Sequence, residues 1–175
     1  MAMQQDIPAW IDGALQPVDK LTVHRQGLRH PAVSVFVMAG GRLLIQRRAL
    51  GKYHTPGLWA NTCCTHPLWG ETALHCATRR LSEELGIADV PLTYRGQVEY
   101  RAEVGGGMIE HEVVDLFLAD CVSPPEVAPN PDEVMDIAWI DAATLQIALA
   151  ERPGEFTPWL QIYLRDHGDR VLPGF

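Results

Sequence analysis

Two short segments of this chain carry residue types that can bind a metal and move a proton. They are Asn61-Thr62-Cys63-Cys64-Thr65-His66-Pro67 and Ile109-Glu110-His111-Glu112-Val113. Side chains alternate between the faces of a strand, so Glu110 and Glu112 would share one face with Cβ atoms about 7 Å apart. Two carboxylates on one face can share one metal ion, and the same spacing places the Cys64 thiol beside His66. The two segments therefore predict an active site.

Nitrogen and oxygen donors form the predicted metal site. The candidate ligands are His24, His30, His66, Glu110 and Glu112. This donor set suits Mn, Zn or Mg. In the alternative interpretation His24 and His30 are surface or capping residues, because an isolated histidine is rarely a ligand. Charges at positions 110 and 112 need a partner, because the residues that follow them are apolar on both faces of the expected strand.

The four cysteines divide into one candidate for chemistry and others with a structural role. Free cysteines usually behave as small buried apolar residues, and this interpretation fits Cys76 and Cys121. Cys64 differs because a histidine and two carboxylates are expected beside it. Since Cys63 and Cys64 are adjacent and Cys76 lies in a helical pattern, we expect free thiols and not disulfides.

Length and composition restrict the class of protein. The chain has 175 residues, of which 47% are hydrophobic and 21% charged, which predicts a single domain with its own core. Residues 1–6 lack the features of a signal peptide and no apolar run approaches the roughly 20 residues that cross a bilayer, so we expect a cytoplasmic protein. The net charge of −8 argues against nucleic acid or an anionic membrane as partner.

An anionic small molecule would need a local basic cluster in this acidic chain. The candidates are Arg47, Arg48 and Lys52, with Lys20, Arg25 and Arg29 earlier in the chain.

Hydrophobic periodicity predicts the elements that position these residues. Strands are expected at residues 33–38, 42–47, 92–102, 109–119 and 136–140. Helices are expected at residues 71–85, 142–150 and 159–166. Gly86 would end the first helix and Asp141 would cap the second. The order predicts an α/β or α+β sandwich with a mixed sheet, and residues 1–20 would form an N-terminal extension, a docked edge strand or a lid.

The helix expected at 71–85 also carries a motif. Glu71, together with Arg79-Arg80-Leu81-Ser82-Glu83-Glu84-Leu85-Gly86-Ile87, resembles the Nudix box, whose helix offers glutamates to a divalent ion that binds a diphosphate. The match is degenerate, because Thr65 replaces the opening glycine and Arg80 replaces the glutamate of the Arg-Glu pair. Without a ligand, the same spacing would give only a salt-bridged helix face, with Arg79 paired to Glu83 and Arg80 to Glu84.

These departures, with the two opening segments, resemble the type I isopentenyl-diphosphate isomerases, a branch of the Nudix superfamily. The resemblance runs from about Lys20 to Trp159. It includes Gln46-Arg47-Arg48-Ala49, Pro56-Gly57-Leu58-Trp59-Ala60-Asn61-Thr62 and Tyr100-Arg101-Ala102. It implies a Nudix-type α/β/α sandwich and an enzyme that interconverts isopentenyl and dimethylallyl diphosphate for isoprenoid synthesis. The expected partner is a small diphosphate substrate, and we expect a monomer.

The resemblance implies a role for each matching residue. Cys64 and Glu112 would be the catalytic pair on opposite faces of the substrate, with Tyr100 near the reacting carbons and Trp159 presenting its π face to them. One divalent metal, Mn or Zn, would be held by His24, His30, His66, Glu110 and Glu112. A Mg ion that arrives with the diphosphate would be held by Glu84. The diphosphate oxygens would contact Lys20, Arg48 and Lys52, with Arg47 or Arg25 as alternatives to Lys52.

The residues suit a 1,3-proton shift. One proton is added to an alkene carbon and another is removed from the far side of the resulting carbocation, in a site closed to water. We expect metal-bound Glu112 on the acid side and a Cys64 thiolate on the other, with the order of the two steps open. Trp159 would stabilise the cation by about 2 kcal/mol.

Two other functions match part of the sequence. A Nudix hydrolase would share the fold and the metal-binding helix, but Arg80 removes a glutamate and hydrolysis gives Cys64 no role. A structural metal-binding module would prefer several cysteines at close paired spacing, and the segment around Cys64 does not have it.

Overall fold

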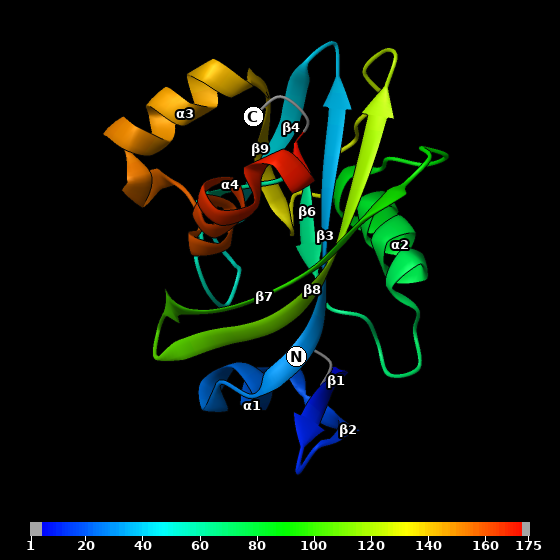
Figure 1. Ribbon diagram of the computed structural model, residues 1–175, viewed down its shortest axis with the longest axis vertical. Coiled ribbons are helices and arrows are strands. Elements are labelled where there is room, and N and C mark those ends of the chain that lie inside the picture. Colours follow the sequence, from blue (N-terminus) through cyan, green and yellow to red (C-terminus); the bar gives the residue numbers. More distant parts are fainter. Residues whose placement is uncertain (1–4, 173–175) are drawn as a thin grey trace.

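A mixed sheet forms the centre of the computed structural model, which describes residues 5–172 (Figure 1). Its strands are β3 (Arg29–Ala39), β4 (Arg42–Arg48), β5 (Trp59–Ala60), β6 (Cys63–Thr65), β7 (Thr93–Gly105), β8 (Met108–Cys121) and β9 (Val134–Asp141). The order is β5-β4-β3-β8-β7, with β6 paired to β3 and β9 to β4. Because β3 and β8 are parallel whereas β7 and β8 are antiparallel, the prediction of a mixed sheet is confirmed.

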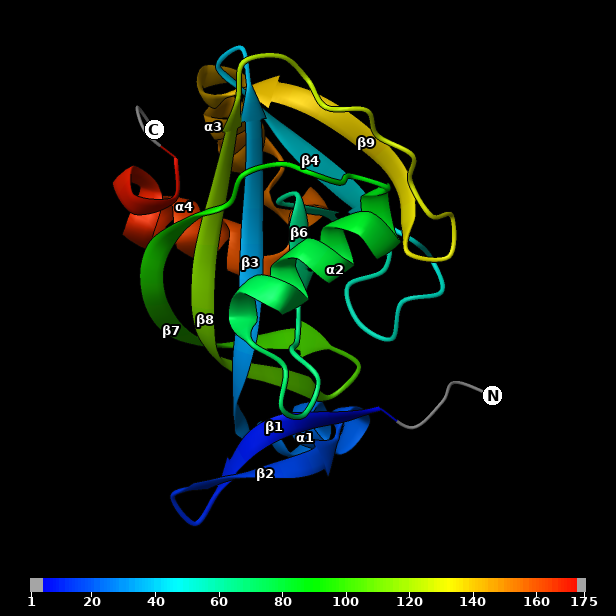
Figure 2. The ribbon, with the colours of Figure 1, turned by 90° about the vertical axis from the view of Figure 1, so that its right-hand side faces the viewer.

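Helices cover both faces of this sheet (Figure 2). On one face lies α2 (Ala73–Leu85), and on the other lie α3 (Ala142–Glu151), the short 3-10 helix Pro153–Glu155 and α4 (Pro158–Val171). Strand β3 serves both cores, since Val35 packs in the cluster that contains Leu81 of α2, whereas Phe36 packs in the cluster that contains Tyr163 of α4. The alternation follows from the period of two in a strand and confirms the predicted α/β/α sandwich.

Two helix boundaries differ from the prediction. Helix α2 begins at Ala73, two residues later than expected, because the Thr72 side chain caps it and Glu71 turns back to bind Arg79. Helix α4 extends to Val171 across a kink at His167, whereas the sequence predicted an end near Asp166. The residues just after Asp166 are mostly polar, so the sequence showed no helical pattern of apolar residues there. Burial of Val171 and Leu172 stabilises this last part of the helix.

The N-terminal segment forms a small layer of its own. Strands β1 (Asp6–Ile11) and β2 (Ala14–Asp19) pair with each other and not with an edge of the main sheet, so of the alternatives given for residues 1–20 the described part forms an N-terminal extension and not an edge strand. Residues 1–4 and 173–175 lie outside the described residues. Residues 1–4 belong to the segment in which no signal peptide was expected. Figure 2 shows this hairpin and α1 (Lys20–Gln26) beyond one end of the main sheet.

Helix α1, which the sequence did not predict, carries two site residues. Asp19 caps it by accepting a hydrogen bond from the Thr22 backbone N–H at 2.9 Å. Lys20 and His24 are four residues apart and so lie on the same side of the helix. Within residues 5–172, no helix is both long and apolar enough to span a membrane.

Gly86 at the end of α2 provides a test of the packing. It has φ of +65°, and a Cβ there would lie 2.9 Å from Ala128 Cβ. We expect Gly86→Ala to lower the free energy of unfolding by about 2–3 kcal/mol, because backbone strain and overlap add. The measurement is urea unfolding, with Gly41→Ala as the matched control.

Gly41 has φ of +73° but nothing within 4 Å of its Cβ position. The control therefore carries only the backbone strain, about 1 kcal/mol. Equal losses in the two variants would show that the contact with Ala128 does not constrain Gly86.

Candidate active site and metal centre

The residues proposed from the sequence converge on one pocket, whose lining comes from α1, α2 and α4 as well as from strands of the main sheet. The pocket is lined by Lys20, Arg48, Lys52, Tyr53, His54, Cys64, Thr65, His66, Arg80, Glu84, Tyr100, Glu110, Glu112 and Trp159. His24 and His30 lie directly against it, with ring centroids 4.9 and 5.0 Å from that of His66. Charged and titratable side chains therefore surround a single small space.

Strand register places the central residues. In the parallel pair β3 and β8, His30 lies opposite Glu112, and in the antiparallel pair β7 and β8, Tyr100 lies opposite Glu112. Ser34 of β3 lies opposite Cys64 of β6. Directly opposed residues on neighbouring strands have Cβ atoms about 4.5–5.5 Å apart, so the register alone brings these side chains into contact.

Four buried residues form a group of metal donors. Atoms of His24, His30, His66 and Glu112 lie within 4.8 Å of one another. The Nδ1 atoms of His24 and His30 lie 2.7 Å from the backbone oxygens of Lys20 and Leu28. Donation from Nδ1 to a carbonyl fixes the tautomer and leaves Nε2 with a lone pair, as in metal-binding histidines.

Unpartnered polar atoms indicate that this group fits a cation. Among the described residues, buried His30 Nε2 and His66 Nδ1 have no hydrogen-bond partner. Such atoms are costly in a protein interior unless an ion or a water satisfies them. The set of imidazoles with a carboxylate suits a divalent metal ion.

Glu110, the fifth predicted ligand, belongs to a second group. Its donor atom clusters with those of His24 and His54. The sequence analysis did not identify His54, which lies in the connection between β4 and β5 where no periodic pattern exists. His111, expected on the opposite face from the glutamates, lies 3.0 Å from Glu99.

The two glutamates share one hydroxyl. Tyr100 Oη lies 2.7 Å from Glu110 Oε2 and 2.8 Å from Glu112 Oε2, although a phenol has a single proton to donate. Burial and the charge of Glu112 raise the pKa of Glu110. Burial alone would raise the pKa of Glu112. The contacts that Glu112 makes with His30 and His66 have the larger combined effect, so the pKa of Glu112 is lowered. The two neighbouring carboxyl groups therefore differ in pKa, with Glu110 the more readily protonated.

Cys64 ends a chain of hydrogen bonds. Its Sγ donates to Asn61 Oδ1 at 3.0 Å and lies 2.7 Å from Ser34 Oγ, which in turn lies 3.0 Å from Tyr163 Oη. Burial raises the pKa of the Cys64 thiol, so in the free protein the sulfur keeps its proton, whereas the sequence suggested a thiolate. The sequence analysis did not identify Ser34 or Tyr163, although Ser34 is the single polar residue in the strand expected at 33–38.

Four cationic side chains also line the pocket. They are Lys20, Arg48, Lys52 and Arg80. Arg80 pairs with Glu84, Nη2 to Oε1 at 2.5 Å, and Arg79 pairs with Glu83 at 3.0 Å, as the helical spacing predicted. The sequence predicted only the ion pair of Arg80 and did not place this residue in the pocket. Its position in the degenerate Nudix box, where a glutamate is expected, could have indicated that it lies there.

Arg47 and Arg25 do not replace Lys52 in the lining of the pocket. Both are exposed, and Arg47 Nε donates to the backbone oxygen of Gly57 at 2.9 Å. Lys52, in contrast, lines the pocket and pairs with Glu133.

Glu84 and Trp159 both line the pocket. The Glu84 carboxylate is buried and accepts from Gln46 Nε2 at 2.9 Å in addition to Arg80; it belongs to neither donor group. Trp159 is 1% exposed, and the Arg48 guanidinium carbon lies 5.2 Å from the centroid of its ring. A cation therefore already contacts the π system that was expected to face the substrate.

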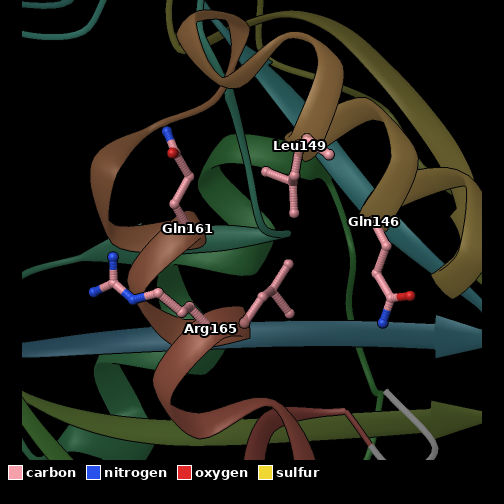
Figure 3. A pocket seen from close by; sticks show the side chains of 6 residues that line it. Gln146, Leu149, Gln161 and Arg165 are labelled. Atoms are coloured by element: carbon pink, nitrogen blue, oxygen red, sulfur yellow. The ribbon is translucent and has the colours of Figure 1, made fainter.

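A separate hollow between α3 and α4 lacks such chemistry (Figure 3). It is lined by Gln146, Leu149, Ala150, Gln161, Leu164 and Arg165. This set offers no nucleophile and no group of metal donors, so the pocket around Cys64 is the candidate site.

Comparison with known proteins agrees with this choice. The NUDIX domain model matches residues 28–160. A protein of Dinoroseobacter shibae named isopentenyl-diphosphate Delta-isomerase is 60% identical over 97% of this chain and 97% of its own. One of the same name from Rhodobacter capsulatus is 55% identical, with the same coverage. The crystal structure of DR0079 from Deinococcus radiodurans has a similar fold, with a TM-score of 0.67 and 14% identity over 85% of this chain and 90% of that one.

Proposed function

This chain belongs to the NUDIX domain family, within which it is a member of the isopentenyl-diphosphate Delta-isomerases, and we propose the following use of its site. The enzyme interconverts isopentenyl and dimethylallyl diphosphate by a 1,3-proton shift. The observation that supports this most directly is the pocket itself, which is lined by a thiol, buried carboxylates and four cationic side chains. An uncharged reacting group with an anionic tail requires both kinds of lining.

The cationic side chains of the pocket bind the diphosphate. Lys20, Arg48, Lys52 and Arg80 would contact its oxygens, since Arg forks and Lys ammonium groups are the usual partners of phosphate. Glu84 would hold a Mg ion that arrives with the substrate, which supplies further oxygen ligands of the kind that Mg prefers. Binding of the charged diphosphate then orients the alkene of the substrate toward Cys64.

The proton transfers take place between Cys64 and Glu112. One group gives a proton to an alkene carbon and the other removes a proton from the far side of the resulting carbocation. Tyr100 links Glu112 to Glu110 and can orient the reacting carboxylate. Tyr100 and Trp159 are buried, at 8% and 1% exposed, so on their side the reacting carbons would be shielded from water that would trap the cation.

The metal centre holds Glu112 in place. We propose His24, His30, His66, Glu110 and Glu112 as its ligands, and Mn or Zn as the metal. The bound ion would supply positive charge that keeps both carboxylates ionised in a buried site. His66 Nε2 and Glu112 Oε1, which lie 2.9 Å apart, would then both be ligands, so that the ion and not a proton on His66 would orient the carboxylate.

The geometry does not favour hydrolysis. In the helix that would carry the hydrolytic glutamates, Glu71 is tied to Arg79 by two contacts of 2.7 Å. Arg80 stands where the box has a further glutamate and lines the pocket as a cation.

NMR in deuterated water tests the function. Purified protein with isopentenyl diphosphate and Mg is followed for dimethylallyl diphosphate, deuterium incorporation and free phosphate. We expect deuterated allylic product with no phosphate. Release of phosphate would indicate a hydrolase, and no reaction in a metal-loaded sample would contradict both activities.

The charge of Lys20 predicts a pH dependence. Burial, together with the nearby Lys52 and Arg80, lowers the pKa of Lys20 to about 8. The ammonium form predominates below this pH and is lost above it, so diphosphate binding weakens as pH rises. We expect KM to rise about tenfold between pH 7.5 and 9.5, as measured by steady-state kinetics.

Lys20→Arg is the matched variant, because a guanidinium remains charged throughout this range. Its KM should stay nearly constant with pH. The same rise in both proteins would show that another group controls substrate binding.

A further inference from the structure

Glu133 lies beside the cationic side chains of the pocket and has no role in the chemistry described above. It is the last residue of the connection between β8 and β9 and does not itself line the pocket. One of its carboxylate oxygens pairs with Lys52 Nζ, and the other lies 3.2 Å from Arg80 Nη2. Lys52 belongs to the connection between β4 and β5, whereas Arg80 belongs to α2. One carboxylate therefore joins two pocket cations from different parts of the chain.

The backbone around Glu133 is bonded to both of these parts of the chain. The Ala49 N–H, in the connection that carries Lys52, donates to the Glu133 carbonyl at 3.0 Å. The Asn130 N–H donates to the Glu84 carbonyl of α2 at 2.9 Å, and the Glu133 N–H donates to the Asn130 carbonyl at 3.0 Å. Figure 2 shows the connection passing the C-terminal end of α2. The backbone thus fixes the position from which the Glu133 side chain reaches the two cations.

The Glu133 carboxylate is charged and partly withdrawn from solvent. Its side chain is 24% exposed, and those of Lys52 and Arg80 are 17% and 18% exposed. Burial alone would raise the pKa of Glu133, but the charges of Lys52 and Arg80 have the larger combined effect and lower it. Ion pairs on an open surface contribute little, because solvent screens them and the side chains remain mobile. At this depth the bridging carboxylate restricts two long side chains.

Order in these two side chains affects the binding of an anion. Lys and Arg side chains have many rotamers, and a ligand that must immobilise them binds more weakly. Glu133 restricts both of them before a diphosphate arrives. Arg80 also keeps a donor for the anion, since among the described residues its buried Nε has no hydrogen-bond partner. As an isolated negative charge, in contrast, Glu133 would only repel a diphosphate, so ordering and repulsion have effects of opposite sign.

We infer that Glu133 is a positioning residue for diphosphate binding, which holds the Lys52 ammonium and the Arg80 guanidinium at the pocket. The inference rests on the diphosphate site proposed above. It gives the connection between β8 and β9 a function beyond linking two strands. The connection ties α2 to the connection between β4 and β5, and the carboxylate at its end orders one cation from each.

Calorimetric titration of the purified full chain with pyrophosphate and Mg tests this role without relying on turnover. Glu133→Gln keeps at most one of the two contacts, because the amide nitrogen cannot accept a hydrogen bond. Glu133→Asp keeps the charge on a side chain that is shorter by one carbon–carbon bond, about 1.5 Å. We expect both variants to bind pyrophosphate about 5- to 10-fold more weakly than the parent protein.

Glu126→Gln is the matched control. Glu126 is an exposed residue of the same connection, so the variant has the same change in net charge and should bind pyrophosphate like the parent. Tighter binding by Glu133→Gln would overturn the inference, because it would show that the carboxylate competes with the anion. Parent-like binding by both Glu133 variants would also overturn it. In the isomerase assay we expect the loss in KM, with kcat within about twofold, and a loss confined to kcat would contradict positioning.

A double-mutant cycle identifies the partner through which Glu133 acts. Lys52→Met removes the ammonium, so adding Glu133→Gln to it should weaken pyrophosphate binding only about 2- to 3-fold further. The full 5- to 10-fold loss in this background would indicate a general structural effect and would overturn the inference.

Folding and function are read separately. Circular dichroism of every variant should match that of the parent protein. A parent protein that binds no pyrophosphate would overturn both the role of Glu133 and the proposed diphosphate site. The expected pattern of binding without isomerisation would support the role of Glu133 and contradict the proposed reaction.

Discussion

We expect Cys64→Ser to lower the isomerase rate by about 10³-fold or more and to leave the metal content unchanged. The serine hydroxyl fits the space but cannot take and return a proton near neutral pH as a thiol can, and proton transfer by a positioned group contributes about 10²–10⁴-fold. The contacts with Ser34 and Asn61 survive the substitution. The measurements are the turnover number and the metal content by mass spectrometry.

The neighbouring cysteine is the matched control. Cys63 is fully buried in the cluster beneath α2, on the opposite face of β6 from Cys64. Cys63→Ala should lose some stability, since it leaves a small cavity, but keep its turnover number within about twofold. Loss of the metal in Cys64→Ser would show that the sulfur belongs to the metal centre and not to the proton transfer.

Glu112→Gln is expected to remove both the metal and the activity. Glu112 is the carboxylate of the four-donor group, and its Oε1 lies 2.9 Å from His66 Nε2 and 3.6 Å from His30 Nε2. An amide of the same shape cannot neutralise the ion or accept a proton, so we expect metal affinity to fall by about 100-fold or more. Turnover should also stay at least about 10³-fold reduced when excess metal restores occupancy.

Glu110→Gln separates the two functions of the neighbouring carboxylate. Glu110 lies on the same face of β8 but has no assigned proton transfer, so metal affinity should fall first and excess metal should restore activity. Activity lost at full metal occupancy would assign Glu110 to the chemistry. If excess metal restored the turnover of Glu112→Gln, Glu112 would be a metal ligand without a role in proton transfer.

Several features were predictable because they depend on local sequence. The alternation of apolar residues predicted β3, β4, β7 and β8 and placed Glu110 and Glu112 on one face. Spacings of three and four predicted α2 and its ion pairs. The candidate site residues likewise lie in motifs that resemble those of the family. The structure places these residues in the lining of one pocket or directly against it.

Tertiary structure decided the features that depend on distant contacts. Ser34 meets Cys64 only through the register of β3 and β6, which packing of the whole sheet sets. His54 lies in a loop without periodicity, and Arg80 reaches the pocket in addition to its helical partner, because loops and long side chains take their positions from their surroundings. The sequence by itself determined which residues could do the chemistry; the fold determined which of them meet.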